Sequence, residues 1–324
     1  MSIAIYNTAL GSHNSGDSII MEAISNELDE LFPMEHKVHF PTHYPLSLKT
    51  LKTIKQSRVA FIGGTNLLTS KFKLNARRNQ WSIGAIGTII LRYHTILMGC
   101  GWKHYNEAES LLSRAFYKTI LSPHYVHSVR DLYTETQLRR SGIPNVCNTA
   151  CPTMWNLTPE HCDQIPQQKA ERVVFTLTDY RKSPKEDAAL VRTLVSSYSK
   201  VFFWLQGMHD LRYLHSLVES SLIDRIEKIG PSLGAYDDIL SSEPDLDYVG
   251  TRLHAGIRAL QKGKRALIIG VDNRAMEKKK DFNLPVIPRT DVDRLALHLK
   301  NRTPTSLTIP QKSIEIWRSQ FRNS

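Results

Sequence analysis

The sequence predicts an α/β protein with two domains, each built on a parallel β-sheet. Apolar runs of strand length alternate with helical segments along most of the chain. Runs such as VAFIGG (59–64) and RALIIGV (265–271) are apolar throughout, as strands are when helices cover both faces of a parallel sheet. The length of 324 residues suits about two such domains, each of the Rossmann-like type.

The first half of the chain repeats a unit of strand, polar loop and helix. IAIY (3–6) is β-prone, the loop GSHNSGD follows it, and residues 18–32 then show the apolar spacing of a helix with one buried face. Asp17 or Ser18 is the expected cap of this helix. Further strands are predicted at 59–64, 95–101 and 125–131, and further helices at 108–121 and 132–141, the second of which ends at Gly142.

The second half begins beyond residues 156–172, a polar stretch without periodicity in which we place the domain boundary. We expect an N-terminal domain at 1–160, a C-terminal domain at 170–310, and a cleft between the two sheets. The tail, 311–324, is predicted to be a closing helix because it has Ile314, Trp317 and Phe321 at helical spacing. Strands are expected at 173–177, 200–207, 225–230, 246–250 and 265–271.

Composition narrows the classes of function. The net charge of +11 suits anionic partners, but no nucleic-acid-binding signature is present, so we expect no nucleic acid as partner. No run is apolar enough for a membrane span and the start does not resemble a signal peptide, so a cytoplasmic protein is expected. Its basic charge is compatible with peripheral contact at the inner, anionic face of the membrane. Cys147, Cys151, His161 and Cys162 match no common zinc spacing, so no metal site is expected.

Informative side chains should follow the strands, because ligands of open α/β sheets bind at the carboxyl ends of strands. In the first domain the loop after 3–6 offers Asn14, Gly16 and Asp17 beside a helix N-terminus, although an ordinary cap and turn would look the same. Arg130 follows the strand at 125–131 and could grip a carboxylate or phosphate, or form a structural pair with Asp131. The glycine-rich loop that begins at the end of the strand predicted at 59–64 contains Gly64, Thr65 and Asn66. Its pattern is neither that of a Walker loop nor GxGxxG.

The stretch YVGTRLHAGIRAL (248–260) is the most informative exit of the second domain. Gly250 is expected to make the turn and Thr251 to cap a helix that starts with Arg252 and contains His254 in its first turn. A permanent cation and a titratable group beside free backbone N–H groups would form an anion site, unless His254 is only satisfied by a local carbonyl. Arg274, in the loop after 265–271, would add a second cation.

Taken together, these motifs resemble the polysaccharide pyruvyl transferase family. The resemblance rests on the order and spacing of NSGD, IGGTNLL, SVRDLYT, GTRLHAGI and VDNR, of which GTRLHAGI is the strongest. It implies a two-domain fold similar to GT-B glycosyltransferases, with domain 1–160 on the acceptor side and domain 170–310 on the donor side. It also implies a reaction that moves the pyruvyl group of phosphoenolpyruvate onto a sugar as a ketal. It places His254 and Arg130 at catalytic positions, and Arg252, Arg274, Thr251 and Gly250 at donor-binding positions; Arg274 stands where the family often has Lys.

The chemistry that this resemblance implies needs two groups that bind anions and one proton donor. Phosphoenolpyruvate would be the co-substrate, and no further cofactor is expected. Expected acceptors are a sugar or a lipid-linked or nucleotide-linked oligosaccharide. Two other functions stay open from the residues alone. The same fold would suit a GT-B glycosyltransferase that uses a nucleotide sugar, and the same cations would suit a protein that binds a sugar or an anion without catalysis.

Overall fold

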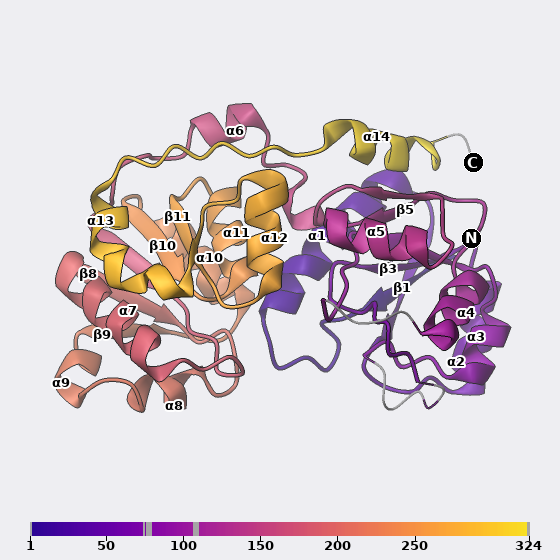
Figure 1. Cartoon of the computed structure of the whole chain (residues 1–324), viewed down its shortest axis with the longest axis horizontal. Helices are drawn as coiled ribbons and strands as arrows, with labels where there is room; N and C mark the ends of the chain where they lie inside the picture. The colour runs from indigo at the N-terminus through magenta and orange to yellow at the C-terminus, as the bar shows by residue number, and fades with distance from the viewer. Residues whose placement is uncertain (1, 74, 76–79, 106–109, 323–324) are drawn as a thin grey trace. The chain divides into compact units, whose positions relative to one another are not determined.

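The computed structural model describes residues 2–73, 75, 80–105 and 110–322 (Figure 1). These residues form two compact units. The first unit consists of Met1–Ser12, Ile20–Trp155 and Ile309–Ser324, and the second of His13–Ile19 and Asn156–Thr308. Neither unit is one continuous stretch, because a short early segment belongs to the second unit and the chain's last residues belong to the first.

The first unit contains a parallel sheet with the strand order β2-β1-β3-β4. A second parallel pair, β5-β6, continues beside it, since Gly99 N donates to Ser128 O at 3.0 Å and Cys100 bridges to Val129. The strands are β1 (Ser2–Asn7), β2 (His36–Pro41), β3 (Ala60–Gly63), β4 (Thr95–Met98), β5 (His127–Val129) and β6 (Val146–Asn148). The helices are α1 (Gly16–Leu31), α2 (Leu48–Gln56), α3 (Ala85–Ile90), α4 (Leu111–Ile120), α5 (Leu132–Arg140) and α14 (Gln311–Ser319).

Both faces of this sheet are buried, as the continuously apolar strands predict. Alternate residues of β3 point to different cores: Ala60 and Ile62 pack with α2 and α4, whereas Phe61 packs with α1 and α14. The closing helix forms at the predicted place, with Trp317 fully buried and 6.2 Å from Phe61 between ring centroids. Residues 108–109 and 323–324 of two predicted helices lie outside the described residues.

The expected cap of the first helix is wrong by a few residues. Helix α1 begins at Gly16, so Asp17 lies in its first turn instead of preceding it. The side chain of Asn14 accepts a hydrogen bond from Gly16 N at 3.2 Å, and this bond supports the start of the helix.

The second unit contains one parallel sheet with the order β12-β11-β10-β7-β8-β9. Its strands are β7 (Arg172–Phe175), β8 (Lys200–Trp204), β9 (Ile226–Ile229), β10 (Leu246–Gly250), β11 (Ala266–Gly270) and β12 (Val286–Pro288). Its helices are α6 (Pro159–Asp163), α7 (Pro184–Ser197), α8 (Asp210–His215), α9 (Ser220–Ile223), α10 (Leu233–Ser242), α11 (Leu253–Gln261), α12 (Asn273–Phe282) and α13 (Leu295–Lys300). 3₁₀ helices span Pro152–Met154 in the first unit and Arg289–Arg294 in the second.

The strand order of the second unit reverses between β7 and β10. From β7 the chain winds through β8 and β9 toward one edge, then returns to β10 and winds through β11 and β12 toward the other. Open α/β sheets bind ligands at such a reversal, where the loops after the two neighbouring strands diverge. The exits of β7 and β10 are therefore where a site is expected in this unit.

Candidate active site

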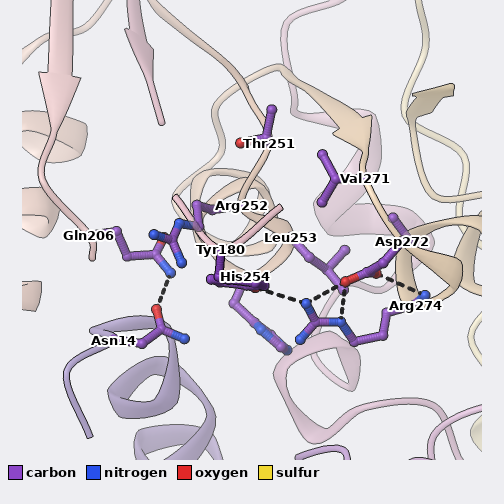
Figure 2. A pocket seen from close by; sticks show the side chains of 11 residues that line it. Asn14, Tyr180, Gln206, Thr251, Arg252, Leu253, His254, Val271, Asp272 and Arg274 are labelled. Atoms are coloured by element: carbon purple, nitrogen blue, oxygen red, sulfur yellow. Dashed lines mark hydrogen bonds and ion pairs between the residues drawn. The ribbon is translucent and has the colours of Figure 1, made fainter. Parts of the chain in front are cut away.

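A pocket lies at the exits of β7, β10 and β11, next to this reversal of strand order (Figure 2). It brings together five of the predicted site residues that belong to the second unit, namely Asn14, Thr251, Arg252, His254 and Arg274. Its remaining lining residues are Tyr180, Gln206, Leu253, Val271, Asp272 and Ala275. Within this unit the structure therefore brings together side chains that follow several strands, and their role in binding stays a prediction.

Gly250 ends β10 because the backbone of β7 passes too close for a side chain. A Cβ at this position would lie 2.7 Å from Thr176 N and 2.9 Å from Thr176 O. Gly250 thus allows the exits of the two central strands to pack closely.

The predicted cap of α11 is wrong. The helix begins at Leu253, Arg252 occupies the cap position without a side-chain cap bond, and His254 is the second helical residue. The Thr251 hydroxyl lies instead 2.9 Å from the Thr178 hydroxyl, which joins the exits of β10 and β7. Thr251 therefore stabilises the reversal point while the first turn of α11 keeps its N–H groups without a cap from this side chain.

Arg252 is buried and its charge is balanced by two carboxylates. Its Nη2 lies 2.6 Å from Asp210 Oδ1 and 3.0 Å from Asp179 Oδ1, and its Nε donates to Leu177 O at 2.7 Å. Only its Nη1 has no partner within the part of the chain that the structure describes. Arg252 thus holds together the loops after β7, β8 and β10, and the two N–H bonds of its Nη1 remain for a ligand.

Burial dominates the electrostatics of Asp210. Removal from water raises its pKa to about 6, although Arg252 and the Gly207 N–H oppose this shift. The same carboxylate accepts from Gly207 N at 2.7 Å and so shapes the turn after β8. Neither Asp210 nor Asp179 was predicted from the sequence, since a single Asp after a strand has no distinguishing pattern.

Tyr180 connects the two arginines of the pocket. The Cζ atom of Arg252 lies over the Tyr180 ring, 5.1 Å from the ring centroid. The Tyr180 hydroxyl accepts a hydrogen bond from Arg274 Nη2 at 2.9 Å. Arg274 also forms an ion pair with Asp272, whose Oδ2 accepts from Nε at 2.8 Å and from Nη2 at 2.5 Å. The Asp272 side chain in addition caps α12. Tyr180 is a further lining residue that the sequence did not single out.

An amide pair closes another side of the pocket. Gln206 Nε2 donates to Asn14 Oδ1 at 2.7 Å (Figure 2). Gly16 makes room for this pair, because a Cβ there would lie 2.6 Å from Gln206 Nε2. Gln206 is 4% exposed, and its Oε1 has no hydrogen-bond partner among the described residues. A buried acceptor without a partner at a pocket wall is a feature that a ligand donor can satisfy.

His254 lines the same pocket and is 8% exposed. It stands in the first turn of α11, where backbone N–H groups favour anions. The charged side chains around it comprise two guanidinium groups, Arg252 and Arg274, and three carboxylates, Asp179, Asp210 and Asp272. The simple cationic site predicted from the sequence is therefore not what the structure contains, because acidic partners on neighbouring loops neutralise both arginines.

The predicted residues of the first unit form their own cluster. Arg130 is 1% exposed, pairs with Asp131 at 3.2 Å and donates to Asn66 Oδ1. Gly101 is a close neighbour, since a Cβ there would lie 2.1 Å from Arg130 Nε. Asp131 also caps α5 by accepting from Thr134 N at 2.8 Å. Arg130 thus makes the structural pair that the sequence left open, and its proposed role in catalysis stays a prediction.

Gly64 and Thr65 lie at the exit of β3 in this unit. Gly64 has φ +72° and Ile20 packs against it, so only glycine fits. Thr65 O accepts from Gly101 N at 2.9 Å. Asp17 is half-buried in the first turn of α1 and does not line the pocket of the second unit. No group of three or more His, Cys, Asp or Glu suited to a metal occurs in residues 2–73, 75, 80–105 and 110–322.

A family model described as polysaccharide pyruvyl transferase matches residues 14–273. The chain belongs to the polysaccharide pyruvyl transferase family. The match runs from Asn14 to the first residue of α12 and includes every predicted site residue except Arg274, which follows directly. It makes the chain a transferase that acts on polysaccharide. No curated protein matches the chain.

A comparison with solved structures confirms the fold through one of them. The UDP complex of S. aureus MnaA shares 12% identity over 94% of this chain and 90% of its own, with a TM-score of 0.55. A lipopolysaccharide outer core galactosyltransferase, WaaB, matches at 11% identity over 100% and 98%, with a TM-score of 0.49. The UDP-GlcNAc 2-epimerase from Neisseria meningitidis matches at 10% identity over 99% and 93%, with a TM-score of 0.46. The likeness to the first shows an α/β fold of the GT-B kind and, at this identity, the fold alone.

Proposed function

We propose that this transferase moves the pyruvyl group of phosphoenolpyruvate onto a sugar of a cell-surface polysaccharide or its precursor. The product is a pyruvate ketal, and phosphate is released. Family membership carries this proposal, and the pocket at the reversal of the second sheet supports it, since His254 lines it beside two arginines. The acceptor would be a sugar or a lipid-linked or nucleotide-linked oligosaccharide.

The charges of the pocket define how such a donor would bind. Phosphoenolpyruvate adds a carboxylate and a phosphate to a site in which three carboxylates already face two guanidinium groups. We therefore expect the ligand to displace Asp272 from Arg274, which is the less buried of the two arginines. Arg252 would contribute its remaining Nη1 group, and the first turn of α11 its backbone N–H groups.

His254 is the proposed proton-transfer residue. A multiply charged anion beside its imidazole favours the protonated form, so binding of the donor would itself prepare the acid. His254 would then protonate the methylene carbon as a sugar hydroxyl attacks the central carbon. The bond from this carbon to the phosphate oxygen breaks, and phosphate leaves. A second hydroxyl then attacks the same carbon and closes the ketal. Of the two hydroxyl protons lost, one balances the new methyl group and the other leaves with phosphate or water.

A nucleotide sugar is the alternative donor. The observation in its favour is that the S. aureus relative in fold was solved with UDP. A GT-B glycosyltransferase would use the same cations for a diphosphate. The third function, binding without catalysis, has no observation of its own in its favour.

The test of the proposal measures phosphate release from phosphoenolpyruvate with a panel of sugar acceptors. We expect release that depends on acceptor, and a product whose mass increases by one pyruvyl group. In parallel, the melting temperature is measured with phosphoenolpyruvate and with UDP-sugars, because a ligand that binds only the folded state raises it. Stabilisation by UDP-sugars alone, without any phosphate release, would favour the alternative donor and reject this one.

A further inference from the structure

The positive charge of the chain is concentrated in one stretch. Residues 36–106 contain eleven Lys and Arg and no Asp or Glu, which equals the net charge of +11 of the whole chain. This stretch includes β2, α2, β3, α3 and β4, all of the first unit. The rest of the chain contains 31 Lys and Arg and 31 Asp and Glu, so the excess of positive charge comes from this stretch.

Large apolar side chains are exposed on the same stretch. Leu48 of α2 is 59% exposed, and Ile86 and Ile89 of α3 are 63% and 71% exposed. The two isoleucines are three residues apart and so share a face of α3. A groove of about 420 Å³ lies between the two helices, with Leu46, Leu48, Leu51, Ile83 and Ile86 among its lining residues. Figure 1 shows α2 and α3 beside each other at the edge of the first unit.

Three lysines of α2 accompany this apolar groove. Lys49, Lys52 and Lys55 are exposed, and none forms an ion pair with an acidic residue in the described ranges of the chain. Lys55 Nζ donates to Arg92 O at 3.0 Å, which joins α2 to the end of α3. We call Leu48, Lys49, Lys52, Lys55, Ile86 and Ile89 the α2–α3 surface.

We propose that the α2–α3 surface docks on an anionic phospholipid bilayer. Apolar side chains beside lysines are what a peripheral surface needs: the first enter the boundary between headgroups and acyl chains, and the second pair with phosphates. A second copy of this chain fits poorly, because an isologous contact would bring lysines against lysines. Nucleic acid fits poorly as well, because Leu and Ile in a groove offer nothing to a phosphate backbone. The inference does not depend on the proposed donor or acceptor.

The test is sedimentation of the full chain with vesicles. One set contains phosphatidylglycerol and phosphatidylethanolamine, and the other only phosphatidylcholine. We expect binding to the anionic set alone, weakening as NaCl rises from about 0.1 M to about 0.5 M because salt screens exposed charges. Lys49→Gln/Lys52→Gln/Lys55→Gln should lower the partition coefficient by roughly tenfold to a hundredfold. Ile86→Ser/Ile89→Ser should lower it by about tenfold or more, since buried apolar area is lost.

The matched control removes the same charge from the second unit. Lys279→Gln/Lys280→Gln/Lys300→Gln replaces three exposed lysines outside the surface and should keep vesicle binding near that of the parent protein. Circular dichroism checks that every variant keeps the parent melting temperature. Equal binding to both vesicle sets, no binding to either, or an equal loss in the control variant would overturn the proposal. Concentration-dependent dimerisation in ultracentrifugation that Ile86→Ser/Ile89→Ser abolishes, without vesicle binding, would assign the surface to a second copy instead.

Discussion

Arg252 and Asp210 form a buried ion pair within the second unit, with 2.6 Å between Nη2 and Oδ1. The guanidinium is 3% exposed and the carboxylate fully buried. A pair this deep is stable only because further bonds satisfy its remaining groups, here Leu177 O and Gly207 N. It connects the loops around the pocket, so Arg252 contributes to the stability of the second unit.

Arg252→Ala should destabilise the second unit by about 3–5 kcal/mol, because Asp210 would lose its cation while remaining buried. Denaturant unfolding followed by intrinsic fluorescence measures this loss. Arg192→Ala is the control, because Arg192 and its partner Glu219 are both half-exposed and such a pair contributes less than about 1 kcal/mol. Equal, small effects of both substitutions would show that Arg252 is not structural.

His254→Gln should reduce phosphate release by about a hundredfold or more, since Gln keeps a polar side chain but cannot transfer a proton. His215→Gln, an exposed histidine of α8 outside the pocket, should keep the parent rate. The measurement is acceptor-dependent phosphate release from phosphoenolpyruvate, with melting curves to show that both variants fold. Near-parent turnover by His254→Gln would remove the proposed proton-transfer role.

Gly16→Ala should weaken ligand binding at the pocket without unfolding the protein. The new Cβ would lie 2.6 Å from Gln206 Nε2 and force the Asn14–Gln206 pair apart. Gly234→Ala is the matched control, since a Cβ in α10 meets nothing within 4 Å and alanine favours the helix by about 1 kcal/mol. Thermal shifts by phosphoenolpyruvate should shrink for Gly16→Ala and stay at the parent value for Gly234→Ala.

His127 should make the first unit sensitive to acid. Burial lowers the pKa of His127 to about 4, and its ring already donates from Nε2 to Ser122 O at 2.9 Å and accepts at Nδ1 from Leu97 N at 3.3 Å. The unfolded chain binds the proton near pH 6.5, so stability is full above that pH and is lost as pH falls toward 4.

Between pH 7.5 and about pH 5.0 the loss from His127 should be about 2 kcal/mol. Urea unfolding at both pH values gives the change in the free energy of unfolding for the parent and for His127→Gln. Subtracting one change from the other isolates the contribution of His127, because the other titrating groups are present in both proteins. An identical pH dependence in both proteins would contradict the prediction. Imidazole titration by NMR provides an independent reading.

Trp317→Ala should destabilise the first unit by about 3–5 kcal/mol, because the side chain is fully buried against Phe61 and Trp155. Ile316→Ala, one position earlier on α14, is the control. Ile316 is 57% exposed, so its truncation should cost less than about 1 kcal/mol. A comparable loss for both would mean that α14 contributes little to the core.

The sequence by itself determined the alternation of strands and helices, the parallel character of both sheets and the family. Each rests on local information: the period of the apolar residues, glycines at strand ends, and the order of short motifs. Local pattern also brought Arg252, His254 and Arg274 forward, because they follow β10 and β11 and such exits meet in a parallel sheet. No helix among the described residues has the length and apolarity of a membrane span.

Only the tertiary structure decided which of these charges are neutralised. Asp179, Asp210, Asp272 and Tyr180 come from other loops, and no spacing along the chain reveals that they meet the two arginines. The cap of α11 was also decided there, because Thr178 draws the Thr251 hydroxyl away from the helix. The reason is common to both: charge balance and hydrogen bonding are settled by neighbours in space, and at a reversal of strand order those neighbours are distant in sequence.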